Sequence, residues 1–574
     1  MREGALVILL IIAIAYFRYQ EYVLLVFQSP FLMICVLLAG GLLYGMYYLV
    51  QHVLEKVGNR IKMHRAGVNT TIKDKGTAYP FISFNIIPAL QSFVRDGQSD
   101  QLTFIGLNAQ RKNKGHIALP DIQRTQHLQV LGMTGTGKST SVFYPLIYQD
   151  ALKKRPVIII DAKGEMSAIN TVNGILAEVG RSDDFLLFSL SHKELSCSYN
   201  PLFVGQYDPQ VVIDAFFSNY DDQNTFFREM SKMIFSHAFF ILHSLGKPFS
   251  PMDVYCYLNN EYCRQEINKQ IVRGNETGWL RLKLLNQVIS DLQDQYKGWR
   301  HVVAGFNNFL MSFNDPLLNE DDSDIVLSEV IREGKVVYFQ LPTNAYPLQA
   351  IAIARMVQAN LRYISSMIQT GQLPNDLLVS VLIDEYGAFA EQTFVEVLNK
   401  ARSSRMMVTL AHQSLGDLQN ISATFMKLID ENTLNKIYLK QTDPELAELI
   451  ARSMGTYTKQ EQTFRMTAGY YGNQIHTGET SNKTVQEFYF SPDKVKNLHK
   501  HGQGYLIYKG DNSQQCVNFG QFGGIKEKPY IKPVRKNKRE GLKLFERYYL
   551  RDEEISQPPP KRKRGKKGEI ALDD

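Results

Sequence analysis

An eight-residue segment in the first quarter of the chain limits the fold more than any other feature. Residues 132–139 read GMTGTGKS and follow a short apolar run, LQVL, at 128–131. This matches the pattern GxxxxGK[ST], in which a loop between a strand and a helix wraps its backbone N–H groups around phosphates. We therefore predict a phosphate-binding loop at the carboxyl end of a strand in a parallel α/β sheet. A helix over about 138–152 follows it and points its positive end at the phosphates.

Each residue type in this loop has a chemical reason. The glycines let the backbone approach the phosphates, Lys138 reaches the terminal phosphates, and the Ser139 hydroxyl binds Mg²⁺. ATP and Mg²⁺ are therefore the predicted cofactors. The strand–loop–helix context argues against a chance glycine-rich turn. The candidate cofactor-binding residues are Gly132, Thr134, Gly135, Thr136, Gly137, Lys138, Ser139 and Thr140.

Two further apolar runs end in acidic residues and are candidates for the strand that completes the site. The run 157–161 (VIIID) ends in Asp161. The longer run 377–385 (LLVSVLIDE) has the composition of a buried central strand and is the better candidate. Asp384 would then be a metal ligand, and Glu385 would polarise the attacking water as a general base. The alternative is a strand that is merely capped by two acids.

Polar residues flank one more predicted strand, MMVTLA at 406–411. Gln413 follows at its carboxyl end, where ligands bind in open α/β sheets, and could sense the γ-phosphate or orient water. Arg402 and Arg405 precede the strand, and an arginine that stabilises the transferred phosphate from a neighbouring subunit is common in this chemistry. Solvated surface arginines are the alternative. The predicted catalytic residues are Lys138, Glu385, Gln413 and Arg402.

The pattern of apolar runs predicts an α/β fold, with a P-loop (RecA-like) parallel sheet and an all-helical insertion. Strands are expected at 128–131, 157–161, 336–341, 377–385, 406–411 and 436–440, with helices between them. From about 205 the spacing of apolar residues changes to helical, as in 226–245. Aromatic residues are frequent there, and on helical stripes they indicate a core. Residues 65–125 look β-rich, and 456–525 look polar and strand-like.

Composition divides the chain into five segments. They are a transmembrane hairpin at 1–52, the first part of a cytoplasmic ATPase domain at 65–204, the all-helical insertion at 205–320, the second part of the ATPase domain at 321–525, and a basic, disordered tail at 526–574. The tail carries KRKRGKK at 561–567, which suits nucleic-acid phosphates, anionic lipid or a solubilising role. The net charge of +7 is only a weak indication of a polyanionic partner.

Two apolar runs at the amino terminus predict a membrane hairpin. Residues 5–17 are uninterrupted by polar side chains, and residues 31–50 carry no charge over about the 20 residues that a spanning helix needs. Basic residues crowd after the second run, which places the long remainder in the cytoplasm. A cleaved signal peptide is disfavoured, because its basic region would be Arg2 alone and no cleavage site precedes the second run.

Taken together, these residues resemble the TraG/TraD-type coupling proteins of conjugation and type IV secretion, over most of the chain. The order and content of the motifs are more specific than the phosphate-binding loop alone. After the two amino-terminal runs, the motifs are GMTGTGKST at 132–140, DAKGE at 161–165, YNPL at 199–202, LIDEYG at 382–387, and ARSS and LAHQS within 401–414.

The resemblance implies a homo-hexameric ring on the bacterial inner membrane, multi-pass, with a large cytoplasmic domain. Its partners would be the relaxosome proteins, single-stranded DNA linked to the relaxase, and components of a type IV secretion channel. The helical insertion matches the domain that recognises cargo and its adaptors in that family.

Site residues carry over one by one. Lys138, Ser139, Asp384 and Glu385 match the ATPase residues of the family, and Gln413 matches its downstream sensor glutamine. Arg402 lies where the family places an arginine that acts in trans. Two departures stand out: Ala162 replaces the proline of DPKGE, and Arg405 stands where a glycine is common. Whether Arg402 or Arg405 acts in trans is therefore open.

Three other interpretations remain. An FtsK- or HerA-like translocase of double-stranded DNA shares the ATPase core, although the extra spans and winged helix typical of FtsK are not evident. A transporter of protein effectors only is a second possibility, and a docking receptor with an incidental ATPase is a third. An ABC transporter is disfavoured, because no LSGGQ-like stretch lies between the loop and the acidic strand.

Overall fold

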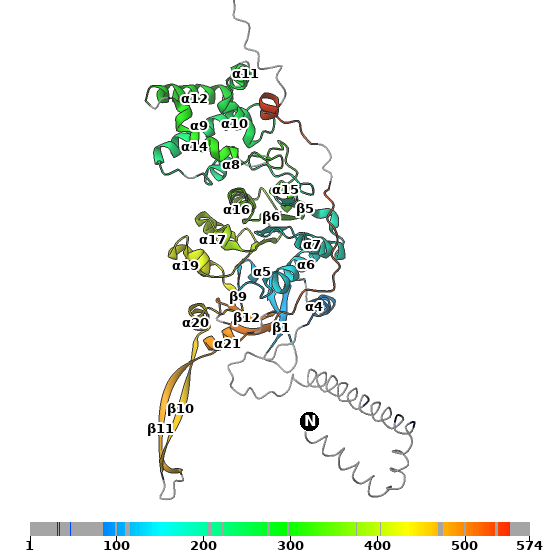
Figure 1. Ribbon diagram of the computed structural model, residues 1–574, viewed down its shortest axis with the longest axis vertical. Helices are drawn as coiled ribbons and strands as arrows, with labels where there is room; N and C mark the ends of the chain where they lie inside the picture. Colours follow the sequence, from blue (N-terminus) through cyan, green and yellow to red (C-terminus); the bar gives the residue numbers. More distant parts are fainter. Residues whose placement is uncertain are drawn as a thin grey trace, which may run out of the picture. The chain divides into compact units, whose positions relative to one another are not determined.

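The computed structural model describes residues 84–550 apart from short gaps, together with the isolated positions 31, 34 and 46 (Figure 1). The gaps are 98–99, 110–114, 204–207, 221, 273–275, 296–297, 375, 402, 469–473, 499–500, 512 and 534–537. The predicted hairpin at 1–52 therefore falls outside the described residues, those three positions excepted, and stays a prediction. None of the helices in the described part of the chain is long and apolar enough to span a membrane.

One large sheet organises the described residues. Its 11 strands lie in the order β2-β1-β13-β12-β9-β3-β8-β7-β4-β6-β5. The strands from β9 to β5 run parallel, which confirms the predicted parallel sheet for this part. These strands are β3 (Leu128–Leu131), β4 (Val157–Asp161), β5 (Phe185–Ser189), β6 (Val336–Gln340), β7 (Val379–Ile383), β8 (Met406–His412) and β9 (Asn435–Leu439). Every residue in them is buried, as expected for a sheet that is covered on both faces.

The other edge of the sheet is antiparallel and was only partly predicted. It comprises β1 (Leu102–Asn108), β2 (His116–Pro120), β12 (Gln503–Tyr508) and β13 (Ser513–Asn518). Residues 65–125 were expected to be β-rich, yet they also contain the helix α4 (Ile86–Arg95). The helix forms because Asn85 caps its first turn, with its side chain accepting from the Ile87 N–H at 3.1 Å. Its apolar face packs on the sheet through Ile86, Leu90 and Phe93.

Helices cover both faces of the sheet and bury two separate cores. One core contains α4, α6 (Tyr144–Leu152) and α7 (Met166–Glu178). The other contains α16 (Pro347–Gln369), α17 (Val395–Ala401) and α19 (Ala423–Asn432). A third, smaller core lies under α20 (Pro444–Ser453) and α21 (Pro492–Lys496). The strand-to-helix order along the chain is the doubly wound pattern that the apolar periodicity predicted.

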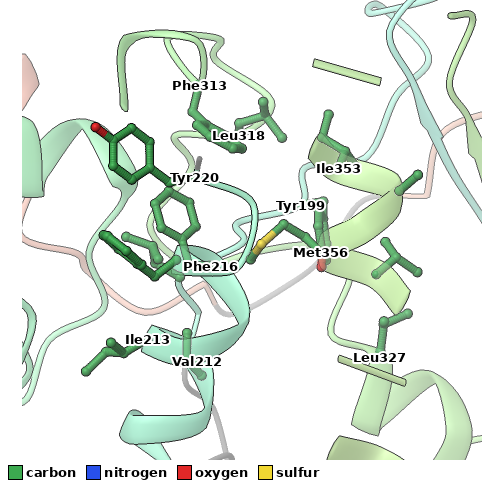
Figure 2. Packing of buried hydrophobic residues seen from close by; sticks show 14 of the residues in the cluster. Tyr199, Val212, Ile213, Phe216, Tyr220, Phe313, Leu318, Leu327, Ile353 and Met356 are labelled. Atoms are coloured by element: carbon green, nitrogen blue, oxygen red, sulfur yellow. The ribbon is translucent and has the colours of Figure 1, made fainter. Parts of the chain in front are cut away.

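Eight helices of the described chain lie between β5 and β6, and we call the first seven of them, α8–α14, the helical insertion (Figure 1). They are α8 (Pro209–Phe217), α9 (Thr225–His243), α10 (Pro251–Asn259), α11 (Glu261–Val272), α12 (Glu276–Gln295), α13 (Trp299–Val302) and α14 (Ala304–Met311). Figure 2 shows how the insertion joins the sheet: Met356 of α16 and Tyr199 lie opposite Phe216 of α8. The insertion therefore shares one continuous core with this face of the sheet.

Two strands of the described region stand apart from the main sheet. β10 (Thr456–Ala468) and β11 (Gln474–Phe488) pair antiparallel with each other in a two-stranded sheet of their own (Figure 1). Their Thr- and Gln-rich sequence matches the polar, strand-like pattern expected from residue 456 onward. A short helix, α15 (Leu327–Arg332), precedes β6 and buries Leu327, Val330 and Ile331 in the same core as the helical insertion.

The expectation of a disordered tail from residue 526 needs correction over residues 526–533 and 538–550, which we call the C-terminal strap. Its anchors are apolar: Tyr530 is 5% exposed and Leu544 is 1% exposed. Near its start the Asn173 side chain donates to the backbone carbonyl of Pro529 at 2.9 Å. Near its end the Phe545 N–H donates to Asp253 of α10 at 2.9 Å. The strap thus runs from the ATPase sheet to the helical insertion, and residues 551–574 lie outside the described part.

Candidate active site

The phosphate-binding loop lies between β3 and a π-helical turn, η1 (Lys138–Phe143), which continues into α6. Gly137 has φ = 94°, a left-handed conformation that favours glycine. A Cβ on Gly132 would lie 2.6 Å from the Thr136 hydroxyl oxygen, so the turn has no room for a side chain there. The Lys138 ammonium donates to the Gly132 carbonyl at 2.8 Å. Burial lowers the pKa of Lys138, and the Glu385 carboxylate opposes this shift.

The two acids that follow β7 face this loop. The Ser139 hydroxyl donates to Asp384 Oδ2 at 3.0 Å, and Glu385 Oε1 lies 3.8 Å from Lys138 Nζ. Glu385 has φ = 52° and ψ = 47°, a left-handed conformation that is costly for a residue with a side chain. Its N–H donates to Asp384 Oδ1 at 3.0 Å. The chain therefore turns sharply at the end of the strand, and both carboxylates are brought to the loop.

Gln413 joins the loop to the second of these acids. Its side-chain NH₂ donates to Glu385 Oε2 at 3.0 Å, and its carbonyl oxygen accepts from the Thr134 hydroxyl at 2.8 Å. It stands one residue beyond β8, which lies next to both β3 and β7 in the sheet. Because neighbouring parallel strands end at the same edge, the three motifs meet there although they are far apart in the sequence.

A second acidic strand end, the weaker of the two candidates from the sequence, also contributes to the site. Asp161 ends β4, accepts a hydrogen bond from the Tyr338 hydroxyl at 2.6 Å, and is 5% exposed. Burial, reinforced by the nearby Asp384, raises the pKa of Asp161. Lys163 donates to Asp384 Oδ2 at 3.1 Å and lies 3.7 Å from Glu385 Oε1. The sequence marked Lys163 only as part of DAKGE, and its contact with Asp384 depends on how β4 lies beside β7.

The remaining predicted residues are less involved. Thr140 is exposed, and its carbonyl oxygen accepts from the Phe522 N–H at 2.9 Å. Arg402 falls outside the described residues, so its role stays a prediction. Arg405 is exposed and has φ = 53° in the turn before β8. Glycine adopts this left-handed conformation without the strain that a side chain adds.

The oxygen atoms around Ser139 suit a hard divalent cation. Ser139 Oγ and Asp384 Oδ2 are 3.0 Å apart, and Asp161 lines the same cavity beside them. Mg²⁺ prefers oxygen ligands and binds few protein groups, because it keeps several waters and the phosphates of its nucleotide. The donor set therefore fits Mg²⁺. Lys138 and the backbone N–H groups of the loop are placed for the phosphates themselves.

Residues 94–526 match the family described as Type IV secretory system Conjugative DNA transfer. This match covers more than half of the chain. The chain belongs to this family. Membership confirms the resemblance to coupling proteins, and the matched range includes the loop, both acidic strand ends and Gln413.

Individual relatives agree with this assignment. The Type 4 coupling protein DotL of Legionella pneumophila is 23% identical over 409 residues, which are 60% of this chain and 50% of DotL. The chain thus spans about half the length of this curated relative. The plasmid coupling protein TrwB in complex with the non-hydrolysable ATP analogue ADPNP has a TM-score of 0.51 at 15% identity, covering 80% of this chain and 99% of TrwB. A trigonal form of TrwBdeltaN70 with sulphate has a TM-score of 0.50 at 16% identity, covering 79% and 96%. These structures share the fold.

Proposed function

We propose that this chain is an inner-membrane ATPase that recruits relaxosome DNA with its attached protein and drives it into a type IV secretion channel during conjugation. The observation that carries the proposal is one polar cluster. Lys138, Ser139, Asp384, Glu385 and Gln413 are linked by contacts of 2.8–3.8 Å, with Thr134 of the loop closing the chain of contacts. Membership in the conjugative DNA transfer family supports the proposal that ATP hydrolysis drives DNA transfer.

Each residue of the cluster has a role that its position supports. Lys138 stabilises the negative charge of the terminal phosphates, and Glu385 accepts the proton of the attacking water. Gln413 lies between Glu385 and the loop, where an amide can orient that water or contact the γ-phosphate. Bound Mg²⁺ would neutralise the phosphate oxygens, with Ser139 and Asp384 holding it. The TrwB complex with ADPNP supports a nucleotide of this class.

The larger assembly that we propose rests on the resemblance to coupling proteins. A homo-hexameric ring would bring Arg402 or Arg405 of one subunit to the phosphates of its neighbour, as arginines do in related hydrolases. The apolar runs at 5–17 and 31–50 support a multi-pass anchor in the inner membrane, with the ATPase domain in the cytoplasm. The helical insertion would receive the DNA, the relaxase and adaptor proteins before the channel components take them over.

The test is ATP hydrolysis by the full-length chain in detergent or lipid nanodiscs, with and without single- and double-stranded DNA. Two variants accompany the wild type: Lys138→Ala removes the phosphate contact, and Lys427→Ala removes a lysine that is 74% exposed on α19. We expect DNA to stimulate hydrolysis in the wild type and in Lys427→Ala. In Lys138→Ala hydrolysis should fall to background, because the buried ammonium is lost from the loop.

The outcomes separate the competing functions. Stimulation by single-stranded DNA supports a coupling protein, whereas strict dependence on double-stranded DNA would favour an FtsK- or HerA-like translocase. Hydrolysis that ignores DNA, in an oligomeric preparation, would move the function to protein cargo alone. Absence of hydrolysis in a preparation that binds ATP would contradict the motor and leave a docking receptor.

A further inference from the structure

A row of buried polar side chains crosses the sheet behind the phosphate-binding loop. It consists of Lys436 on β9, Gln129 on β3 and His412 at the end of β8, each 0% exposed. The three strands are neighbours, so the row runs sideways through the middle of the sheet. Burial of such groups costs free energy unless each is hydrogen-bonded, and the proposed hydrolysis assigns none of them a role.

The direction of the hydrogen bonds follows from Lys436. Its ammonium contacts four oxygen atoms: the Asp430 carbonyl at 2.8 Å, Asp430 Oδ1 at 2.8 Å, the Thr433 hydroxyl at 2.6 Å and Gln129 Oε1 at 2.5 Å. Burial lowers the pKa of Lys436 to about 7, but the Asp430 carboxylate beside it favours the charged form. An ammonium group has donors and no acceptor, so the amide oxygen of Gln129 faces it. The Gln129 NH₂ then points the other way, toward His412 Nε2 at 2.7 Å.

This orientation selects one tautomer of His412. Because the Gln129 NH₂ donates to Nε2, that nitrogen carries the lone pair and the proton resides on Nδ1. Nδ1 lies 2.8 Å from the carbonyl oxygen of Ser414, to which it donates. Burial lowers the pKa of His412 to about 4, although its hydrogen bond to Ser414 opposes the shift. The ring is therefore neutral near pH 7, and its Nδ1–H is the donor to the Ser414 carbonyl.

The bond to Ser414 fixes the loop that carries Gln413. The Ser414 N–H donates to Asp417 at 3.3 Å, and its hydroxyl accepts from the Gly416 N–H at 3.0 Å. On its other side, the His412 backbone carbonyl accepts from the Gly132 N–H at 3.4 Å. One buried residue thus contacts both the phosphate-binding loop and the loop of the sensor glutamine.

We propose that His412, oriented by Gln129 and Lys436, is a positioning residue that holds the Gln413 amide between Thr134 and Glu385. Its kinetic consequence rests on the proposed ATP hydrolysis, whereas its effect on loop order does not. Groups that orient a metal ligand from the outer shell typically change affinity or activity by about 10–100-fold when removed, and we take the same range for a group that orients Gln413. The outer end of the row is partly exposed: the Asp430 side chain is 37% exposed and also pairs with Lys509 at 2.6 Å.

The experiment compares three variants of the full-length chain. His412→Leu removes both ring nitrogens, and His412→Asn keeps an amide NH₂ near the position of Nδ1. Gln149→Leu is the matched control, because Gln149 is 1% exposed and its amide bonds only the Phe104 backbone and Pro145 among the hydrogen bonds described. The readouts are kcat, the affinity for ADPNP, and hydrogen–deuterium exchange of the amides at 413–417 without nucleotide.

We expect His412→Leu to lower kcat about 10–100-fold with little change in ADPNP affinity, and to speed exchange at Ser414 and Gly416. His412→Asn should recover most of the lost kcat and the slow exchange, whereas Gln149→Leu should lower thermal stability but leave both readouts alone. Unchanged exchange in His412→Leu, or an equal kcat loss in Gln149→Leu, would overturn the proposal. If the wild type itself fails to hydrolyse ATP, the proposed function fails and the exchange data alone decide this inference.

Discussion

The candidate active site and the helical insertion differ in what holds their side chains together. In the site, charged and polar groups at the ends of separate strands contact one another, and two of the acids repel: Asp384 raises the pKa of Asp161 in addition to the effect of burial. In the insertion, aromatic rings fill the core, with Phe216 and Phe235 at 5.3 Å and Phe309 and Phe313 at 5.2 Å between centroids.

The difference assigns the chemistry to the candidate active site and much of the folding stability to the helical insertion. A left-handed glutamate and crowded carboxylates are unfavourable, and the surrounding sheet must hold them in place. The aromatic cluster is favourable in itself, since each buried ring removes a large apolar surface from water. Changes in the site should therefore alter the reaction and leave the fold, whereas changes in the insertion should do the reverse.

The largest expected effect is in the site. Glu385→Gln removes the proposed base and keeps the size of the side chain, so the rate of ATP hydrolysis should fall by about 10²–10⁴-fold. Affinity for ADPNP and the midpoint of thermal unfolding should stay close to those of the wild type. Single-turnover hydrolysis measures the rate. Glu396→Gln, an exposed glutamate on α17, is the control. A comparable loss in that control, or wild-type turnover in Glu385→Gln, would contradict the role.

A change in the aromatic cluster tests the other half of the comparison. Phe216 is 0% exposed and contacts rings from α9 and α14, so Phe216→Ala should lower the apparent free energy of unfolding by about 3–5 kcal/mol. Affinity for ADPNP below the unfolding transition should be retained. Urea unfolding followed by circular dichroism measures the loss, with Phe226→Ala at a 38% exposed position as the control. If the folded variant no longer bound ADPNP, the insertion core would also determine the active site, which would contradict the comparison.

The same difference explains how much could be predicted from the sequence. The central strands were predicted because a strand covered on both faces must be a continuous apolar run, as in LLVSVLIDE. The site residues followed, since polar side chains directly after such runs meet at one edge of a parallel sheet. Asp384, Glu385 and Gln413 were selected in this way, and the structure brings them together at the loop. Their exact partners, such as Lys163, depend on the order of strands, which apolar runs do not reveal.

The C-terminal strap is a segment whose ordered structure could not be predicted from the sequence. Its sequence is basic and polar apart from a few anchors such as Tyr530 and Leu544, and composition of this kind predicts disorder. Much of its attachment comes from backbone groups: the Arg539 N–H donates to Asp322 at 2.7 Å, and the Lys543 N–H donates to Asp321 at 3.0 Å. Backbone N–H groups are the same in every residue except proline, so the sequence carries no signal for these contacts.

A buried histidine makes the stability of the site region depend on pH. Burial lowers the pKa of His127 to about 4, from 6.5, and its ring contacts the Leu398 carbonyl at 3.0 Å. As the pH falls from about 6.5 to about 4, His127 becomes protonated in the unfolded chain but stays neutral in the folded chain. The free energy of unfolding therefore decreases across this window. At about 1.4 kcal/mol per pKa unit, the loss is about 3 kcal/mol.

The variant His127→Asn removes this titration and tolerates the left-handed backbone at this position, where φ = 61°. We expect the urea midpoint of the variant to fall less than that of the wild type between pH 7 and pH 4.5. The other titrating groups are common to both chains and cancel in the comparison. Parallel decreases in the two proteins would show that His127 takes up its proton while folded.

The smallest expected effect concerns the strap, the element that joins the two regions. β5 is the last strand of the sheet, and its Leu187 N–H donates to the Tyr530 hydroxyl at 3.2 Å. Tyr530→Phe leaves that buried N–H without this acceptor, so the apparent free energy of unfolding should fall by about 1–2 kcal/mol. Tyr489→Phe, at a tyrosine that is 52% exposed, is the control. The strap bonds both the sheet and α10. Loss of the Tyr530 hydrogen bond should therefore broaden the unfolding transition, because the sheet and the insertion can then unfold separately. A lower midpoint with an unchanged width would mean that the shared core beneath α8 and α16, and not the strap, makes the two regions unfold together.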